Sequence, residues 1–442
     1  MEALSTSWVN AERSGHADSH RSLSSLPWVA TMGPITLFDK SFLQSLSEDE
    51  SVWFDHFFSC NVCPMFFVET LADLEKDVDG RTPEQEVSLI AAKFPEVSGT
   101  PSVHHSSLLL GNLMGEKVPL TGQIMLAGGR VVKSGETTAI VYDKSPEAGA
   151  FARWMHGEFL ETERSYAKGW RDALASVDLV RIGRTLNSLG ITGKSCRTMK
   201  QAWVFADWLV MWQNPSVEPL NMVLLFQNIP REYHLPVVDR WKAAGCPPIV
   251  SFAPYAAHVL KVDLFFHVAL AASLISGDRP SNRVDIAYLY YLPFCKIFVS
   301  NDKLHRDSAS FFLRSDQEFV WGGELKSDLK RLNRRYLGLP EETKSQGVSS
   351  FAHNPPKDGG FLVASLWDRH FGNWRDRGDD LGPRDKEEES RLLKEINALV
   401  DAPAVSDNEA GVNQERVDVV SIQHMVRRKK GSWWQVPSDL KE

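Results

Sequence analysis

The sequence is poor in cysteine and contains no long uninterrupted hydrophobic run. Five cysteines in 442 residues are too few, and an odd number, for the disulfide framework of a secreted domain. The longest strongly apolar run, residues 264–275, includes His267 and is shorter than the ~20 residues that a membrane-spanning helix needs. The first 30 residues are polar and have no apolar signal core. These absences predict a soluble, cytoplasmic protein that does not enter a membrane.

Two common signatures of enzymes are also missing. There is no G-x-x-x-x-G-K-[ST] phosphate loop and no G-x-S-x-G nucleophile elbow, which argues against nucleotide hydrolysis by such a loop and against an α/β-hydrolase. Basic residues are in the minority, with 49 Lys+Arg against 57 Asp+Glu and a net charge of -8. Proteins that coat nucleic acid without specificity are usually basic. Any contact with nucleic acid must therefore use a local basic patch.

The composition is that of a folded protein, since 43% of the residues are hydrophobic and 10% are aromatic. Short apolar runs alternate with helical patterns near both ends of the chain, whereas the middle reads as mainly helical with one β-hairpin at residues 121–143. We therefore expect an α/β fold, in which a large insertion divides a parallel-sheet core with helices on both faces. The expected segments are a leader (1–33), a first core part (34–75), the insertion (76–250), a second core part (251–338) and a partly flexible C-terminal extension (339–442).

Carboxylates recur where a predicted strand meets a loop or a helix. Asp39 follows the run ITLF, and Asp302 follows KIFVSN. Asp285 and Glu69 each lie where we expect a helix to start. Because functional groups gather at the carboxyl ends of strands in open α/β sheets, we expect these four side chains to converge. Ionised carboxylates at one place repel each other, and a hard cation such as Mg²⁺ or Mn²⁺ removes that cost.

The same residues carry a resemblance to a known family. Residues 284–304 (VDIAYLYYLPFCKIFVSNDKL) resemble the closing motif of PIN-like nuclease domains, and residues 35–39 and 66–74 resemble the first strand and second acidic motif of that family. These segments cover about a quarter of the chain, counting residues 33–75 and 255–315. The large insertion departs from a minimal PIN domain. Carried over by position, the resemblance implies metal ligands at Asp39, Glu69, Asp285 and Asp302, with Ser300 or Asn301 as auxiliary polar residues.

The resemblance implies a metal-dependent endoribonuclease with Mg²⁺ or Mn²⁺ as cofactor and RNA as partner, leaving 5′-phosphate and 3′-hydroxyl ends. A bacterial toxin or anti-phage effector is a hypothesis motivated only by how often PIN-like domains with large additions serve there. Two alternatives stay open, namely a structure-specific DNA nuclease and a catalytically inactive PIN-like interaction protein. The insertion is a candidate surface for a homo-oligomer or a regulatory partner.

Each carboxylate also has an ordinary structural interpretation. Asp39 and Asp285 suit helix N-caps or first turns, where aspartate is favoured. Glu69 is the least secure ligand, because Asp73 or Glu75 could take its place one turn later.

Basic residues near these motifs are candidates for phosphate contacts. They lie just beyond Asp302 and on a predicted helix at residues 326–336, and they are Lys303, His305, Arg306, Lys330, Arg331, Arg334 and Arg335. A solvated helix face is an equal interpretation. The tail RRKKGSWW pairs cations with aromatic rings that could stack on bases, but we expect it to be disordered. For Cys60 and Cys63 we expect buried free thiols, because adjacent His104 and His105 make a poor second half of a zinc site.

Overall fold

The protein is described from a computed structural model. The described residues are 4–10, 33–76, 80–126, 128–135, 137–176, 178–181, 184, 196–211, 217–376, 386–406 and 419–438. Most of the expected leader (residues 11–32) and parts of the expected flexible connections (377–385 and 407–418) lie outside these ranges.

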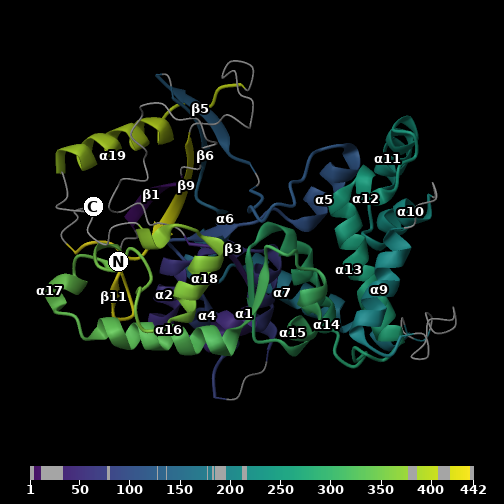
Figure 1. The fold of residues 1–442 in the computed structure, drawn as a ribbon, viewed down its shortest axis with the longest axis horizontal. Helices are drawn as coiled ribbons and strands as arrows, with labels where there is room; N and C mark the ends of the chain where they lie inside the picture. Colours follow the sequence, from purple (N-terminus) through teal and green to yellow (C-terminus); the bar gives the residue numbers. More distant parts are fainter. Residues whose placement is uncertain are drawn as a thin grey trace.

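A parallel sheet of five strands forms the core of the fold, flanked by helices (Figure 1). Its spatial order is β4 (Gly99–Pro101), β3 (Ser59–Val62), β2 (Ile35–Phe38), β7 (Ile297–Ser300) and β8 (Glu318–Trp321). The chain builds outward from β2 through β3 to β4 and later returns to place β7 on the other side of β2. The direction of strand order therefore reverses between β2 and β7. In open α/β sheets, ligands bind at the carboxyl ends of strands at this switch point.

The strands predicted at ITLF and KIFVS are confirmed as β2 and β7. Their central residues are fully buried, and Leu37 pairs with Phe298 across the two strands. Continuous apolar runs are typical of parallel strands that are covered on both faces. The third strand, β4, lies inside residues 76–250, so part of the range expected to be an insertion contributes to the core sheet.

The helices nearest the sheet have local signals in the sequence. Ser47 and Glu50 form a capping box that starts α2 (Glu48–Phe57), and Thr82 and Gln85 do the same for α4 (Pro83–Ala91). Pro64 occupies the first turn of α3 (Pro64–Leu71), a position that tolerates the missing N–H of proline. The other helices of this part are α1 (Lys40–Ser45), α15 (Lys303–Ser308), α16 (Gly322–Leu337), α17 (Glu341–Lys344) and α18 (Leu362–His370).

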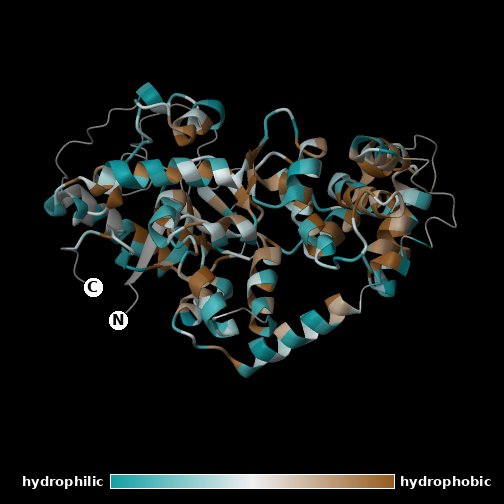
Figure 2. Cartoon of the chain, turned by 90° about the horizontal axis from the view of Figure 1, so that it is seen from below, coloured by the Kyte–Doolittle hydropathy of each residue, from teal (hydrophilic) through white to brown (hydrophobic). Residues whose placement is uncertain are grey.

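A lobe of helices lies to one side of the sheet, at the right of Figure 1. It is the mainly helical part that the sequence predicts, and hydrophobic residues, brown in Figure 2, are visible on its helices. The apolar run at residues 264–275 lies largely in the long helix α13 (Pro254–Ala271), and α9 packs along this helix. Its other main helices are α5 (His105–Met114), α9 (Met199–Val210), α10 (Glu218–Phe226), α11 (Arg231–Ala243) and α12 (Ile249–Phe252), while α6 (Pro146–Met155) and α7 (Glu161–Ala175) pack toward α4 and α3. Among the described residues, no helix is both long and apolar enough to cross a bilayer.

A second sheet joins segments that are distant in the sequence. The predicted hairpin is confirmed as β5 (Arg130–Ser134) and β6 (Thr137–Tyr142). β9 (Val419–Val426) pairs with β6 in parallel and with β1 (Leu4–Asn10) in antiparallel orientation. Residues 4–10 of the expected leader therefore form a strand. α19 (Lys386–Val400) lies against this sheet, where Ile396 and Leu399 pack on Val132, Ala139 and Val141.

The expectation of a disordered tail at RRKKGSWW is wrong. The segment forms the short strands β10 (Lys429–Lys430) and β11 (Trp433–Trp434). Trp433 is fully buried and packs on Trp53, with 4.7 Å between the ring centroids. Lys430 is buried as well and donates from Nζ to the carbonyl oxygen of Phe94, at 2.8 Å. These two side chains are anchors of the fold and do not offer a surface for stacking bases.

Candidate functional site at the strand switch point

Asp39 lies at the carboxyl end of β2 and is buried. It is the N-cap of α1, because its Oδ1 accepts a hydrogen bond from the backbone N–H of Phe42, at 2.9 Å. Its Oδ2 accepts from the hydroxyls of Ser41, at 2.6 Å, and Ser300, at 2.8 Å. The capping interpretation is therefore correct, and the same side chain also faces the end of β7.

His305, in α15, is fully buried between the two strand ends. Its Nδ1 lies 2.8 Å from Oγ of Ser300 and 3.5 Å from Oδ2 of Asp39, and its Nε2 lies 2.7 Å from the carbonyl oxygen of Asp285. Burial opposes the imidazolium, but the hydrogen bond to Asp39 and the charge of that carboxylate raise the pKa of His305 to about 9. In turn, burial opposes ionisation of Asp39, and the interactions with His305 hold its pKa below the usual value.

A protonated His305 satisfies every polar group around it. Ser300 Oγ accepts from the backbone N–H of Asp302, at 2.8 Å, and from Nδ1–H of His305, and donates its own proton to Asp39. The Nε2–H group donates to the carbonyl oxygen of Asp285. Sequence reasoning treated His305 only as one more cation that could follow a phosphate backbone. The structure corrects this, since the side chain points inward three residues after Asp302.

Asp285 is in the first turn of α14 (Asn282–Ala287), as expected. Its side chain is half-buried, and within the described part of the chain its carboxylate has no hydrogen-bond or ion-pair partner. Burial, together with the charges of Glu69, Asp302 and Asp39, raises the pKa of Asp285 to about 7 against the opposing charge of His305. An unpaired carboxylate with three acidic neighbours is the feature of this site that suits a cation.

Asp302 lies at the carboxyl end of β7, where the sequence predicts it. It is the N-cap of α15, and its Oδ1 accepts from the backbone N–H groups of Leu304, at 2.6 Å, and His305, at 3.3 Å. The neighbouring Asn301 donates from Nδ2 to Oγ of Ser45, at 3.2 Å, and its backbone N–H donates to Oγ of Ser41. Asn301 therefore ties the end of β7 to α1.

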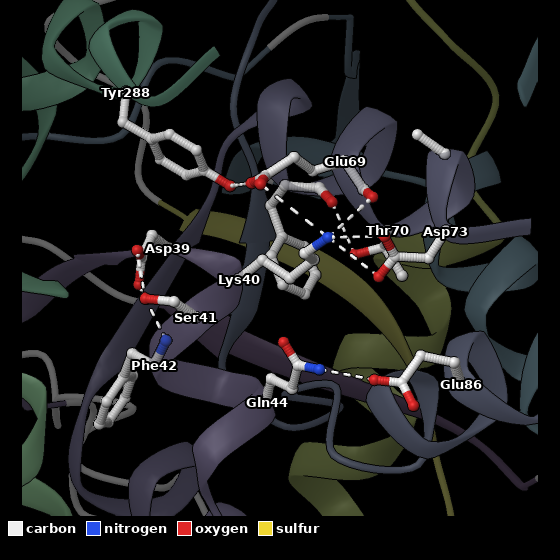
Figure 3. A network of polar contacts seen from close by, with 12 residues as sticks. Asp39, Lys40, Ser41, Phe42, Gln44, Glu69, Thr70, Asp73, Glu86 and Tyr288 are labelled. Atoms are coloured by element: carbon white, nitrogen blue, oxygen red, sulfur yellow. Dashed lines mark hydrogen bonds and ion pairs between the residues drawn. The ribbon is translucent and has the colours of Figure 1, made fainter. Parts of the chain in front are cut away.

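Glu69 is in the last turn of α3 and not at a helix start, which corrects the prediction. The reason is that β3 ends at Val62 and Pro64 already begins the helix. Figure 3 shows Glu69 beside Tyr288, whose hydroxyl donates to Oε2 at 2.6 Å. Burial raises the pKa of Glu69, and so do the charges of Asp39 and Asp73, while Lys40 and the Tyr288 hydrogen bond oppose the increase.

Asp73 is almost completely buried and already has two cationic partners. The ammonium of Lys40 lies 2.9 Å from its Oδ2, and a guanidinium nitrogen of Arg171 lies 3.3 Å from its Oδ1 (Figure 3 shows the Lys40 contact). Lys40 Nζ also donates to the carbonyl oxygen of Glu69, at 3.2 Å, but lies 3.9 Å from Oε1 of its carboxylate. Asp73 is therefore an ion-pair partner of Lys40, and Glu69 is the freer carboxylate of the two.

Hydrogen bonds through Ser300 and His305 thus link Asp39, Asp302 and Asp285 at one end of the sheet, and the charge of Glu69 also raises the pKa of Asp285. They do not form a ready coordination shell, because in the described ranges no three His, Cys, Asp or Glu side chains are placed to share one ion. The donor set is chemically suitable for Mg²⁺ or Mn²⁺, since it consists of carboxylate oxygens with an excess of negative charge at Asp285. Because Ser300 and His305 hold Asp39, binding an ion would require Asp302 or Glu69 to reorient toward Asp285.

The predicted basic residues are exposed and fall into two groups. Lys303 and Arg306 are on α15 beside the site. On α16, Leu329 and Leu332 are buried, and the cations face solvent, as the interpretation of a solvated helix face expects. Two of these cations have partners in the chain, since Arg331 forms an ion pair with Asp328 at 3.1 Å and Arg335 with Asp358 at 2.9 Å. At 1.5 Å per residue, Lys330 and Arg334 lie roughly 12 and 18 Å along α16 from Gly322.

Cys60 and Cys63 are buried free thiols, as expected. Burial raises the pKa of Cys63 to about 12, which leaves its thiol protonated and unreactive. Burial also lowers the pKa of His105 to about 3.

Comparisons with known proteins add no relative. No family model matches the sequence, and neither the curated proteins nor the solved structures include one with significant similarity to it.

Proposed function

We propose that this protein is a metal-dependent endoribonuclease with a PIN-like core, and that its active site is the acidic cluster at the ends of β2 and β7. The observation that supports the proposal most directly is the unpaired carboxylate of Asp285. Its unpaired carboxylate, with a pKa near 7 caused by burial and by three neighbouring carboxylates, lies at the switch point of a parallel sheet. The resemblance of residues 35–39, 66–74 and 284–304 to the acidic motifs of PIN-like nucleases supports the same site.

Asp39, Glu69, Asp285 and Asp302 are the residues that would hold Mg²⁺ or Mn²⁺. The ion would supply positive charge to a phosphodiester and lower the pKa of water. The protein's own groups prepare the site. Ser300 and His305 fix the carboxylate of Asp39, and Asn301 fixes the end of β7 against α1. The exposed cations Lys303 and Arg306 lie where they can contact the phosphates on either side of the cut.

The substitution Asp302→Asn tests the proposal. Asparagine caps helices about as well as aspartate, so α15 should remain intact while a ligand charge is lost. We expect cleavage of single-stranded RNA in Mg²⁺ or Mn²⁺ to fall by at least about 100-fold, since even residues outside the coordination shell cost 10–100-fold in metal sites. Asp239→Asn, which changes an exposed carboxylate on α11, is the matched control and should cleave normally. Undiminished cleavage by Asp302→Asn would refute the site.

Two further measurements separate the alternatives. Faster cleavage of a branched DNA than of single-stranded RNA would favour a structure-specific DNA nuclease. The absence of Mn²⁺ or Mg²⁺ binding in calorimetry would favour an inactive interaction protein. For a nuclease we expect Mn²⁺ binding that Asp285→Asn weakens, because Asp285 is the carboxylate without a partner in the described chain.

A further inference from the structure

An open cavity of about 590 Å³ lies between α16 and α18, next to the acidic cluster. Its volume is within the range of small-molecule pockets. The residues of its wall that matter here are Trp321, Gly323, Ser327, Arg331, Gly360 and Ser365.

Trp321 connects this cavity to the proposed active site. It is the last residue of β8 and the register partner of Ser300 in β7, whose hydroxyl donates to Asp39. Neighbouring strands are about 4.8 Å apart, so the tryptophan starts one strand away from the carboxylates. The next residue, Gly322, packs so closely on Asn301 that a Cβ atom there would lie 2.6 Å from the Asn301 Oδ1. Glycine therefore lets the cavity wall and the end of β7 stay in contact.

The indole of Trp321 is suited to stacking. It is only partly buried, and it forms part of the cavity wall. The guanidinium carbon of Arg306 lies 5.0 Å from the ring centroid, a cation–π contact. This geometry places an exposed cation and an aromatic face together at the rim of the site. Single-stranded nucleic acids are bound by this combination, in which bases stack on aromatic rings and cations follow the phosphates.

The charged residues of the cavity wall suit a bound group that is neutral, and they do not suit a phosphate. Arg331 is neutralised by Asp328 at 3.1 Å, and Asp328 also accepts from the backbone N–H of Val363 at 2.9 Å. The wall carries a further carboxylate at Glu324. On α15, Lys303 and Arg306 are exposed; Arg306 contacts Trp321 of the cavity wall and forms only a surface ion pair with Asp307, at 3.6 Å. A nucleotide would therefore enter with its base in the cavity and its phosphate toward α15.

We propose that this cavity binds one unpaired base of single-stranded RNA, stacked on Trp321 beside the acidic cluster. The inference rests on the proposed nuclease function and specifies its substrate as single-stranded, because a paired base in a duplex is not free to stack on a side chain. The hydroxyls of Ser327 and Ser365 donate to the carbonyl oxygens of Gly323 and Phe361, so their oxygen atoms remain able to accept a hydrogen bond from the edge of a base.

The experiment measures binding without cleavage, using the full chain in EDTA and the fluorescence anisotropy of a labelled twelve-nucleotide oligouridine. We expect Trp321→Ala to weaken binding by about 5- to 150-fold, the loss found when one stacking aromatic is removed. Trp208→Ala, which removes an exposed tryptophan on α9, is the matched control and should bind normally. Ser327→Leu narrows the cavity without changing Trp321 and should also weaken binding. This second variant keeps the test valid if Trp321→Ala folds poorly.

The outcomes are distinguishable. Equal binding by Trp321→Ala, Ser327→Leu and Trp208→Ala would overturn the base pocket, as would equal affinity for a duplex of the same length. If the wild-type protein still cleaves RNA in that case and Asp302→Asn does not, the nuclease proposal survives. If the wild-type protein neither binds nor cleaves the oligonucleotide, both proposals fall.

Discussion

Nδ1 of His305 lies 3.5 Å from Oδ2 of Asp39, and both side chains are buried where β2 and β7 end. Protonated His305 therefore places a positive charge inside the fold, where it offsets part of the negative charge of the acidic cluster. With a folded-state pKa of about 9 against about 6.5 in the unfolded chain, the contribution of His305 to stability is complete below pH 6.5. It is lost as the pH rises through 9.

The first prediction concerns the removal of this charge. His305→Gln leaves Asp39 buried without its cation, and breaking a buried ion pair typically costs about 3–5 kcal/mol. We expect the free energy of unfolding in urea at pH 7 to fall by that order. Asp39→Asn in the same background removes the unpaired charge and should restore part of the loss. A double variant that loses the sum of the two single losses would show that the two residues are not coupled.

The second prediction concerns Asp285, whose ionisation destabilises the folded protein. Its pKa is raised to about 7, so the folded protein loses stability as the pH rises from about 4 through 7 and the carboxyl ionises. Asp285→Asn removes this penalty. At 1.36 kcal/mol per pKa unit the full shift is about 4 kcal/mol, and screening of a half-buried group reduces it to about 2.

Thermal unfolding in EDTA checks this prediction. We expect Asp285→Asn to be more stable than wild type at pH 8 and nearly equal to it at pH 4, with Asp239→Asn as the exposed control. Mg²⁺ should stabilise wild type and not the variant, because a ligand that binds only the folded state stabilises it. A variant that is less stable than wild type at pH 8 would contradict the assignment of Asp285 as an unfavourable charge.

The parts of the site that follow from local sequence were predictable. Asp39 and Asp302 cap helices directly after short buried strands, and both features depend on residues within a few positions. His305 was assigned the wrong role, because only the packing of α15 against Tyr288 and Phe298 determines that it points inward. The pattern Asp302-x-x-His305 at a helix start was the available signal, since the two positions are one turn apart.

The parts of the fold that depend on distant contacts were not predictable. β4 has three residues and no apolar run, and only its pairing with β3 makes it a strand. β1 pairs with β9 at the other end of the chain. The tail was misjudged because its cations and glycine are typical of an exposed segment, while Lys430 and Trp433 are buried by contacts with residues near 50, 94 and 333.

The third prediction concerns four histidines with lowered pKa values, of which two are buried and two are partly buried. Burial lowers the pKa of His105 to about 3 and of His56, His258 and His424 to about 4. The unfolded chain takes up these protons first, so their contribution is complete above pH 6.5 and is lost as the pH falls toward 4. For His56 the loss at pH 4 is about 3 kcal/mol.

Thermal unfolding between pH 7 and 4 provides the test. We expect the melting temperature of wild type to fall steeply over this range and that of His56→Gln to fall less. His156→Gln changes an exposed histidine and should follow the wild-type curve. If His56→Gln has the wild-type pH dependence, proton uptake by His56 does not drive acid unfolding.

The fourth prediction concerns the C-terminal strands. Trp433 and Trp53 both donate from Nε1 to Oδ1 of Asn333, at 2.8 and 3.0 Å, so one amide in α16 joins the tail to α2. Trp433→Ala should therefore lower the free energy of unfolding by about 3–5 kcal/mol, the usual cost of truncating a buried tryptophan.

Trp434→Ala is the matched control for this prediction, because the neighbouring indole is partly exposed and contacts Lys429. Its loss should stay below about 1 kcal/mol, as is usual for surface positions. Urea denaturation of both variants measures the difference. Similar small losses for the two would mean that the tail contributes little to the core. Because α16 begins at the wall of the proposed base cavity, a large loss confined to Trp433→Ala would also show that the tail stabilises the helix beside the site.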